Sequence, residues 1–270
     1  MASVDRSDAC TALRATVPRL SALIRSASDP ATPALGSWDV AGVAAHLSHA
    51  FDVVPALTTP DAAALIDDLW DLAQLTVAWV DRDEERDLAV LAERIDTRAE
   101  AFLAAVDGRA DASFPWIVEG HEVPLTVLVC HLLNETLVHG HDIAVAAGLD
   151  WKIEPRHAAL VVEGFLVPIL ARLDPSSLVQ PSGDARFRAR YDIRLRGAGR
   201  FGVVLRDGGA TVVPSLEGRA DCHLSVDPTG FLLVLWGRRS QWHALRRGQL
   251  LAWGRRPWVG LQLRSRLRTP

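Results

Sequence analysis

The sequence predicts a protein of two parts, a helical first half followed by an α+β second half. Apolar residues recur every three or four positions through the first half, which is the helical period, whereas polar and apolar residues alternate in several short segments of the second half, as in strands. The charge balance also changes, because residues 1–150 hold 9 basic and 24 acidic side chains and residues 151–270 hold 20 basic and 9 acidic ones. We therefore expect two domains, 1–150 and 151–270, of opposite charge.

The first half is expected to form a bundle of long helices. The helical period predicts helices at about 6–27, 38–54, 60–79, 84–106 and 124–147. Ser37 is the expected N-cap of the second helix, and Gly148 is the expected end of the fifth. The charged run DRDEERD that follows the third helix is expected to be a solvated face or turn. Long helices joined by fairly short loops indicate a helix bundle.

The second half is expected to begin with one more helix, at about 155–173. Four segments with strand character follow at short spacing, at 186–196, 200–207, 209–214 and 222–227. Glycine or aspartate between them indicates a run of antiparallel strands. Two further helical segments are predicted at 227–239 and 256–267, which completes an α+β domain.

Composition excludes several classes of protein. Hydrophobic residues make up 49% and charged residues 23% of the 270 residues, the balance of a globular protein. The chain contains no apolar run long enough to span a membrane and no signal-like N-terminus, so we expect a cytoplasmic protein without a membrane partner. Its three cysteines are far apart and odd in number, which argues against a disulfide framework or a thiolate metal site. Its arginines are scattered and lack a nucleic-acid-reading motif, so nucleic acid is not an expected partner.

The fifth predicted helix carries a polar stripe in an otherwise apolar segment. Glu135 and His139 are four residues apart and therefore lie on one helical face, which His131 extends. Burying an unpaired carboxylate is costly, and a metal ion relieves that cost. A catalytic site needs a third protein ligand. The second helix offers His46 and His49, and periodicity alone does not choose between them.

Two segments of the first half resemble motifs of a known family. SWDVAGVAAHLSHAF at 37–51 is similar to the first motif of the mycothiol-dependent maleylpyruvate isomerase family, and NETLVHGHDIAVAAG at 134–148 is similar to the second. DCHLSVDPTGFLLVLWGRR at 221–239 resembles, more loosely, the sterol-carrier-like domain that often follows. The resemblance implies a DinB-like four-helix bundle followed by a smaller α+β sterol-carrier-like domain.

The resemblance also implies a set of site residues. The implied metal ligands are His46, Glu135 and His139, which favours His46 over His49. Two imidazoles and one carboxylate suit zinc, although another divalent ion is possible. Asp142 lies three residues beyond His139 and is expected to accept a hydrogen bond from a ligand imidazole.

The activity implied by the resemblance is that of a zinc- and mycothiol-dependent isomerase or S-transferase. The partners are then a small thiol and a small, electrophilic, anionic substrate, with maleylpyruvate as the family's type substrate. The thiolate adds to an electrophilic carbon, and rotation followed by elimination converts a cis alkene to a trans one. An arginine of the second domain is catalytic in the family, and Arg238 is the candidate here, with Arg239 beside it. A guanidinium can bind a carboxylate bidentately.

The alternative interpretation is a binding module without enzymatic activity. The second domain would then hold an apolar ligand, and the bundle would be structural. Metal content distinguishes the two. Cys130 is not expected to take part in either case, because it lies five residues before Glu135 and about 140° around the helix from the ligand face.

Overall fold

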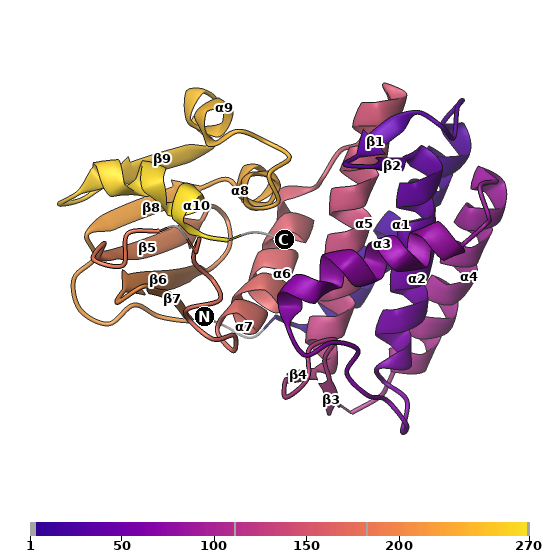
Figure 1. Cartoon of the computed structure of the whole chain (residues 1–270), viewed down its shortest axis with the longest axis horizontal. Helices are drawn as coiled ribbons and strands as arrows, with labels where there is room; N and C mark the ends of the chain where they lie inside the picture. The colour runs from indigo at the N-terminus through magenta and orange to yellow at the C-terminus, as the bar shows by residue number, and fades with distance from the viewer. Residues whose placement is uncertain (1–3, 111, 182, 269–270) are drawn as a thin grey trace. The chain divides into compact units, whose positions relative to one another are not determined.

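The computed structural model describes residues 4–110, 112–181 and 183–268 and divides them into two compact units. The first unit is Val4–Ile153, and the second begins at Glu154. The first unit is built on long helices, and the second on a sheet with helices (Figure 1). The predicted fold class, a helical region followed by an α+β domain, is confirmed. None of the helices in the described ranges is both long and apolar enough to cross a membrane.

Four long helices form the bundle of the first unit. They are α1 (Arg6–Ser26), α2 (Val40–Ala56), α4 (Leu88–Val106) and α5 (Leu125–Ala147). Both α1 and α2 pack against α4 and against α5 (Figure 1). Helix α5 is apolar on nearly all sides and is buried along most of its length, as such a helix must be. Any polar side chain on α5 is therefore placed inside the protein, where it needs a partner.

The second helix begins two residues later than predicted. Asp39, and not Ser37, caps α2, because its carboxylate accepts a 2.7 Å hydrogen bond from the backbone N–H of Gly42. Trp38 and Asp39 instead form β2 (Trp38–Asp39), which pairs with β1 (Pro33–Leu35). The aspartate cap thus fixes where α2 starts and leaves Trp38 just outside the helix.

The prediction of a helix at 60–79 is wrong over its first half. Residues 69–71 form a 3₁₀ turn, η1 (Leu69–Asp71), and the α-helix α3 is Leu72–Arg82. The backbone N–H groups of Leu65 and Ile66 both donate to the carbonyl oxygen of Ile117, which holds this segment in an irregular, non-helical form. A contact distant in sequence therefore overrides the local helical pattern.

The fourth helix is also shorter than predicted. It begins at Leu88 because Asp87 caps it, accepting a 2.8 Å hydrogen bond from the N–H of Ala89. The charged run at 81–87 is the end of α3 followed by five residues without regular structure, and Asp83 within it is largely buried. A hairpin of β3 (Ser113–Pro115) and β4 (Glu122–Pro124) leads into α5, which ends at Gly148 in the left-handed conformation, as predicted.

A five-stranded sheet forms the centre of the second unit, in the order β7-β6-β5-β8-β9. The strands are β5 (Ala189–Leu195), β6 (Arg200–Arg206), β7 (Gly209–Val213), β8 (Cys222–Val226) and β9 (Leu250–Trp253). The prediction of antiparallel strands throughout is wrong for β8, which runs parallel to β5. Residues 214–221 carry the chain back along the sheet after β7, so β8 runs in the direction of β5 instead of forming another hairpin. The short β9 was not predicted.

The second unit also contains several short helical segments. They are α6 (Pro155–Val161), a π-helical turn η2 (Val162–Leu166), α7 (Val167–Leu170), α8 (Pro228–Leu235), α9 (Gln241–Arg246), η3 (Pro257–Gln262) and α10 (Leu263–Arg266). The predicted helix at 155–173 is thus helical as far as Leu170, and α9 was not predicted. The hydroxyl group of Tyr191, which is fully buried, donates a 3.0 Å hydrogen bond to the carbonyl of Val259 and fastens η3 to β5.

One row of the sheet carries an ionic cluster around a buried carboxylate. Asp192, His223 and Trp253 are paired neighbours across β5, β8 and β9. The Asp192 carboxylate is bound by Arg200 through Nε and Nη2, and Nδ1 of His223 lies 2.5 Å from its Oδ2. The imidazole in turn stacks on Trp253, with ring centroids 5.5 Å apart. Each oxygen of the Asp192 carboxylate therefore has a protein partner.

Candidate metal centre

Helices α2 and α5 pack together and bring three side chains to one point. His46 comes from α2, and Glu135 and His139 come from successive turns of α5. Nε2 of His46 lies 3.2 Å from Oε2 of Glu135, and Nε2 of His139 lies 3.3 Å from the same oxygen. One ligand atom from each of the three lies within 4.8 Å of the others. The three side chains are only 11–12% exposed, so the cluster is almost closed to solvent.

Aromatic packing holds the imidazole of His46 in place. Trp38, just before α2, stacks on the ring with centroids 5.0 Å apart, and the ring of His139 meets it edge-on at 4.7 Å. The Asp39 cap sets the start of α2 and so sets the position of Trp38. Trp38 was not singled out from the sequence as a site residue, although it is part of the first motif.

Further polar groups orient the two α5 side chains. Oδ2 of Asp142 lies 3.0 Å from Nδ1 of His139, so Asp142 holds this imidazole with Nε2 toward Glu135. The other oxygen of Glu135, Oε1, accepts a 3.1 Å hydrogen bond from Nδ2 of Asn134 and lies 3.6 Å from Nε2 of His131. The two oxygens of the Glu135 carboxylate therefore contact different groups. Oε2 faces the two imidazoles of His46 and His139, and Oε1 faces Asn134 and His131.

Burial and hydrogen bonding give these groups perturbed acidities. Burial alone would raise the pKa of the Glu135 carboxyl group, but contacts with three imidazoles outweigh it and hold the pKa well below its usual range. Burial lowers the pKa of His46 and favours its neutral form. Burial opposes protonation of His139 as well, yet its hydrogen bonds to Asp142 and Glu135 raise its pKa to about 9. In the metal-free protein His139 therefore carries a proton at neutral pH, which an arriving metal ion would displace.

The donor set fits a divalent metal ion. In a tetrahedral site with bonds of about 2.0–2.1 Å, neighbouring ligand atoms lie about 3.3–3.4 Å apart. The two separations from Oε2 of Glu135, 3.2 and 3.3 Å, are close to that spacing. Two imidazole nitrogens and one carboxylate oxygen are common zinc ligands, and three protein ligands leave a coordination position for another molecule.

Two residues weighed from the sequence lie apart from this cluster. Nε2 of His49 lies 3.2 Å from a carboxylate oxygen of Asp83, and the His49 ring approaches Trp79. Cys130 is fully buried, and burial raises the pKa of its thiol, which keeps it protonated. Asn134, by contrast, contacts Glu135 and was overlooked in the sequence. In the sequence, the one feature that pointed to Asn134 was its amide side chain within an otherwise apolar helix.

The candidate arginines belong to the second unit, in the turn that follows α8. Nη1 of Arg238 donates a 2.7 Å hydrogen bond to the carbonyl of Trp236. Nη1 of Arg239 donates a 3.0 Å hydrogen bond to Oε1 of Gln249. These contacts tie both guanidinium groups to the end of α8 and the start of β9.

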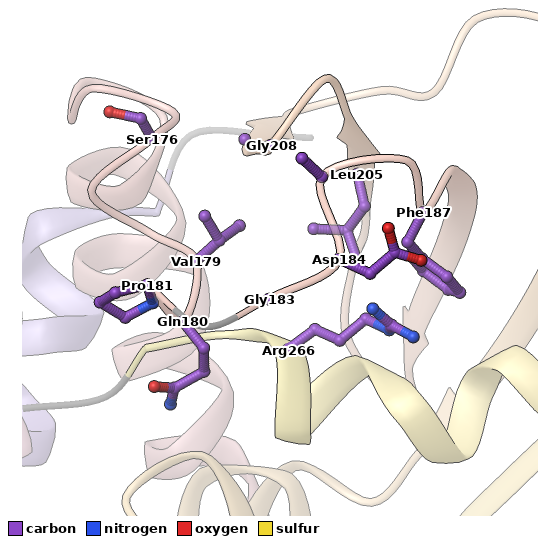
Figure 2. A pocket seen from close by; sticks show the side chains of 12 residues that line it. Ser176, Val179, Gln180, Pro181, Gly183, Asp184, Phe187, Leu205, Gly208 and Arg266 are labelled. Atoms are coloured by element: carbon purple, nitrogen blue, oxygen red, sulfur yellow. The ribbon is translucent and has the colours of Figure 1, made fainter.

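The second unit also contains a hollow of about 230 Å³ (Figure 2). Val179, Leu205 and Phe187 contribute apolar groups to its lining, and Asp184 and Arg266 contribute charged ones. The guanidinium carbon of Arg266 lies 3.5 Å from the centre of the Phe187 ring, and its Nη2 donates to Gln262. A lining of this mixed character does not favour an apolar ligand.

Comparison with known proteins places this geometry in a family. The family model described as the mycothiol maleylpyruvate isomerase N-terminal domain matches residues 7–144. A crystal structure of the mycothiol-dependent maleylpyruvate isomerase is similar with a TM-score of 0.55 and 15% identity, over 93% of this chain and 95% of that one. A histidine-to-alanine mutant of that enzyme gives a TM-score of 0.56 and 13% identity, with the same coverage. At these identities the likeness shows the fold. No curated protein sequence matches the chain.

Proposed function

The chain belongs to the mycothiol maleylpyruvate isomerase N-terminal domain family, since the family model matches residues 7–144, and from this premise we propose that it is a zinc- and mycothiol-dependent isomerase or S-transferase. Its substrate is a small anionic electrophile of the maleylpyruvate kind. The observation that carries the proposal is the convergence of two imidazoles and one carboxylate inside the bundle, at separations that suit a metal ion.

In this proposal the three converging side chains hold the ion. His46, Glu135 and His139 supply one donor atom each. Asp142 accepts the Nδ1 proton of His139, which leaves Nε2 of that ring as the donor. When bound, a divalent ion lowers the pKa of a coordinated thiol and so supplies a thiolate at neutral pH. The surrounding side chains of α2 and α5 exclude water, which protects a reactive thiolate.

The carboxylate groups of an anionic substrate require cations, and the second half of the chain supplies most of them. We assign this role to Arg238 on the family resemblance. Replacing Arg238 with glutamine is expected to lower kcat/KM about 10- to 100-fold, since a hydrogen bond to a charged group contributes about 1.5–3 kcal/mol, and to leave metal content unchanged. Arg247→Gln, in the turn after α9, is the matched control. If both variants behave like the parent protein, Arg238 does not bind the substrate.

The central test is thiol dependence. Turnover of maleylpyruvate by the zinc-loaded protein is expected to require added mycothiol and to saturate with its concentration, because Cys130, the cysteine nearest the site in sequence, is fully buried on α5. Cys130→Ala is expected to keep both metal and activity. An equal rate without any thiol would contradict the proposal and would favour hydrolysis instead.

A further inference from the structure

The two oxygens of the Glu135 carboxylate contact different groups, which suggests how one coordination position of the metal ion stays available. We propose that Asn134 and His131 are positioning residues that hold Oε1 of Glu135 away from the ion, so that Glu135 ligates through Oε2 alone and a thiol can enter. This inference rests on the proposed function, because it concerns the same metal centre. It adds two residues that do not bind the ion themselves.

The geometry of α5 supports this assignment. Asn134 immediately precedes Glu135, and His131 lies one turn before it, so all three are carried by one rigid helix. Nδ2 of Asn134 lies 3.1 Å and Nε2 of His131 3.6 Å from Oε1, whereas both ligand imidazoles approach Oε2. The two oxygens thus have separate sets of neighbours.

The separate contacts of the two carboxylate oxygens affect how Glu135 can coordinate a metal ion. A carboxylate can bind a metal ion through one oxygen or through both, and the second mode occupies an additional coordination position. A hydrogen bond to one oxygen is strong in a buried site of low dielectric constant and opposes its rotation toward the ion. Asn134 and His131 are 2% and 6% exposed, so water competes little for Oε1.

The amide of Asn134 and the imidazole of His131 would also be buried if they only stabilised the fold. The variants must therefore distinguish positioning of Glu135 from stabilisation of the fold. Asn134→Leu has a similar volume and removes the donor. His131→Leu removes the second group, and His131→Gln restores an amide donor at about the position of Nε2. Thr136→Val is the matched control, because Thr136 is buried on the same helix and its hydroxyl bonds to the carbonyl of Leu132.

The experiment uses the full chain loaded with Co²⁺, whose visible absorption reports coordination number, and titrates it with 2-mercaptoethanol. The parent protein, Thr136→Val and His131→Gln are expected to show strong four-coordinate absorption and a sulfur-to-cobalt charge-transfer band as the thiol binds. Asn134→Leu and His131→Leu are expected to bind Co²⁺ with weaker visible absorption, typical of higher coordination. Their apparent affinity for the thiol should fall about tenfold, the lower end of the effects seen for groups behind metal ligands.

The results distinguish the positioning role of Asn134 and His131 from the proposed metal-dependent function. If the parent protein binds no Co²⁺, the metal-dependent function itself is wrong. If it binds Co²⁺ and thiol but both leucine variants match it in spectrum and thiol affinity, only the positioning role is wrong. If Asn134→Leu does not fold, the comparison of His131→Leu with His131→Gln decides. Equal loss in both His131 variants would overturn the role of His131 as a donor.

Discussion

Glu135 in the bundle and Asp192 in the sheet are both buried carboxylates that lie against histidine, and their charges are balanced in different ways. Asp192 in the sheet is 5% exposed, and Arg200 and His223 bind it directly. Glu135 in the bundle is 9% exposed and is contacted by three imidazoles and one amide. A guanidinium is always protonated, so the charge of Asp192 is balanced permanently. Imidazoles can be neutral, and a neutral imidazole is a metal ligand.

The comparison indicates which buried acid is the better candidate for binding a metal ion. Beside Asp192 the guanidinium of Arg200 already binds both carboxylate oxygens. Around Glu135 the compensating charge is a proton on an imidazole, which a divalent ion can replace. The same pairing of acid and histidine is therefore structural in one unit and suited to function in the other.

The largest expected effect comes from removing the groups that converge on Glu135. The purified protein should contain about one divalent metal ion per chain. Glu135→Gln, His46→Ala and His139→Ala should each reduce this content to near zero, because a three-ligand site loses affinity sharply without one ligand. Elemental analysis provides the measurement, and His49→Ala is the control that should keep its metal. Full metal content in His46→Ala would show that His46 is not a ligand.

A smaller effect is expected from the acid behind the ligand. Asp142→Asn should weaken metal binding about 10- to 100-fold, because loss of a carboxylate behind a ligand imidazole lowers the basicity of that ligand. Competition with a chromophoric chelator measures the change. The same substitution at Asp192 should leave metal affinity unchanged, which tests the contrast between the two acids. Equal affinity in the parent protein and Asp142→Asn would mean that Asp142 does not support the site.

The smallest effect concerns stability. Asp192→Asn should reduce the free energy of unfolding by about 1–3 kcal/mol, since it removes charge-assisted hydrogen bonds to Arg200 and His223. Asp207→Asn is the control, because its ion pair with Arg188 is well exposed on both sides and should contribute less than about 1 kcal/mol. Urea unfolding of both variants measures the difference, and similar losses would contradict the structural role of Asp192.

The difference in the free energy of unfolding between the parent protein and Asp192→Asn should depend on pH, which tests the structural role of Asp192 again. Burial would raise the pKa of Asp192, but its bonds to Arg200 and His223 outweigh burial and lower it. A lowered folded-state pKa means that the stabilisation is fully present above the unfolded-state value of about 3.9 and is lost as the pH falls through the folded-state value. The gap between the parent protein and Asp192→Asn should therefore be constant near neutral pH and should narrow below about pH 4.

The long helices whose apolar residues recur at the helical spacing were the part of the fold that the sequence predicted. The limits of α1 and α5 follow from apolar spacing and, for α5, from Gly148, whose positive φ suits a helix end. The segment before α3 was not predictable, because its non-helical form depends on the hydrogen bonds of Leu65 and Ile66 to Ile117. The parallel pairing of β5 with β8 likewise depends on the route of the chain between strands.

The sequence by itself determined that Glu135 and His139 share a face of α5, because helical periodicity places residues four apart in line. It also determined, through apolar residues on the remaining sides, that this face is buried. Only the tertiary structure decided how α2 is turned against α5, which directs His46 to Glu135 and His49 to Asp83. Periodicity fixes which side chains lie together on one helix. It does not fix how a second helix rotates against the first, because that rotation is set by side-chain packing between them.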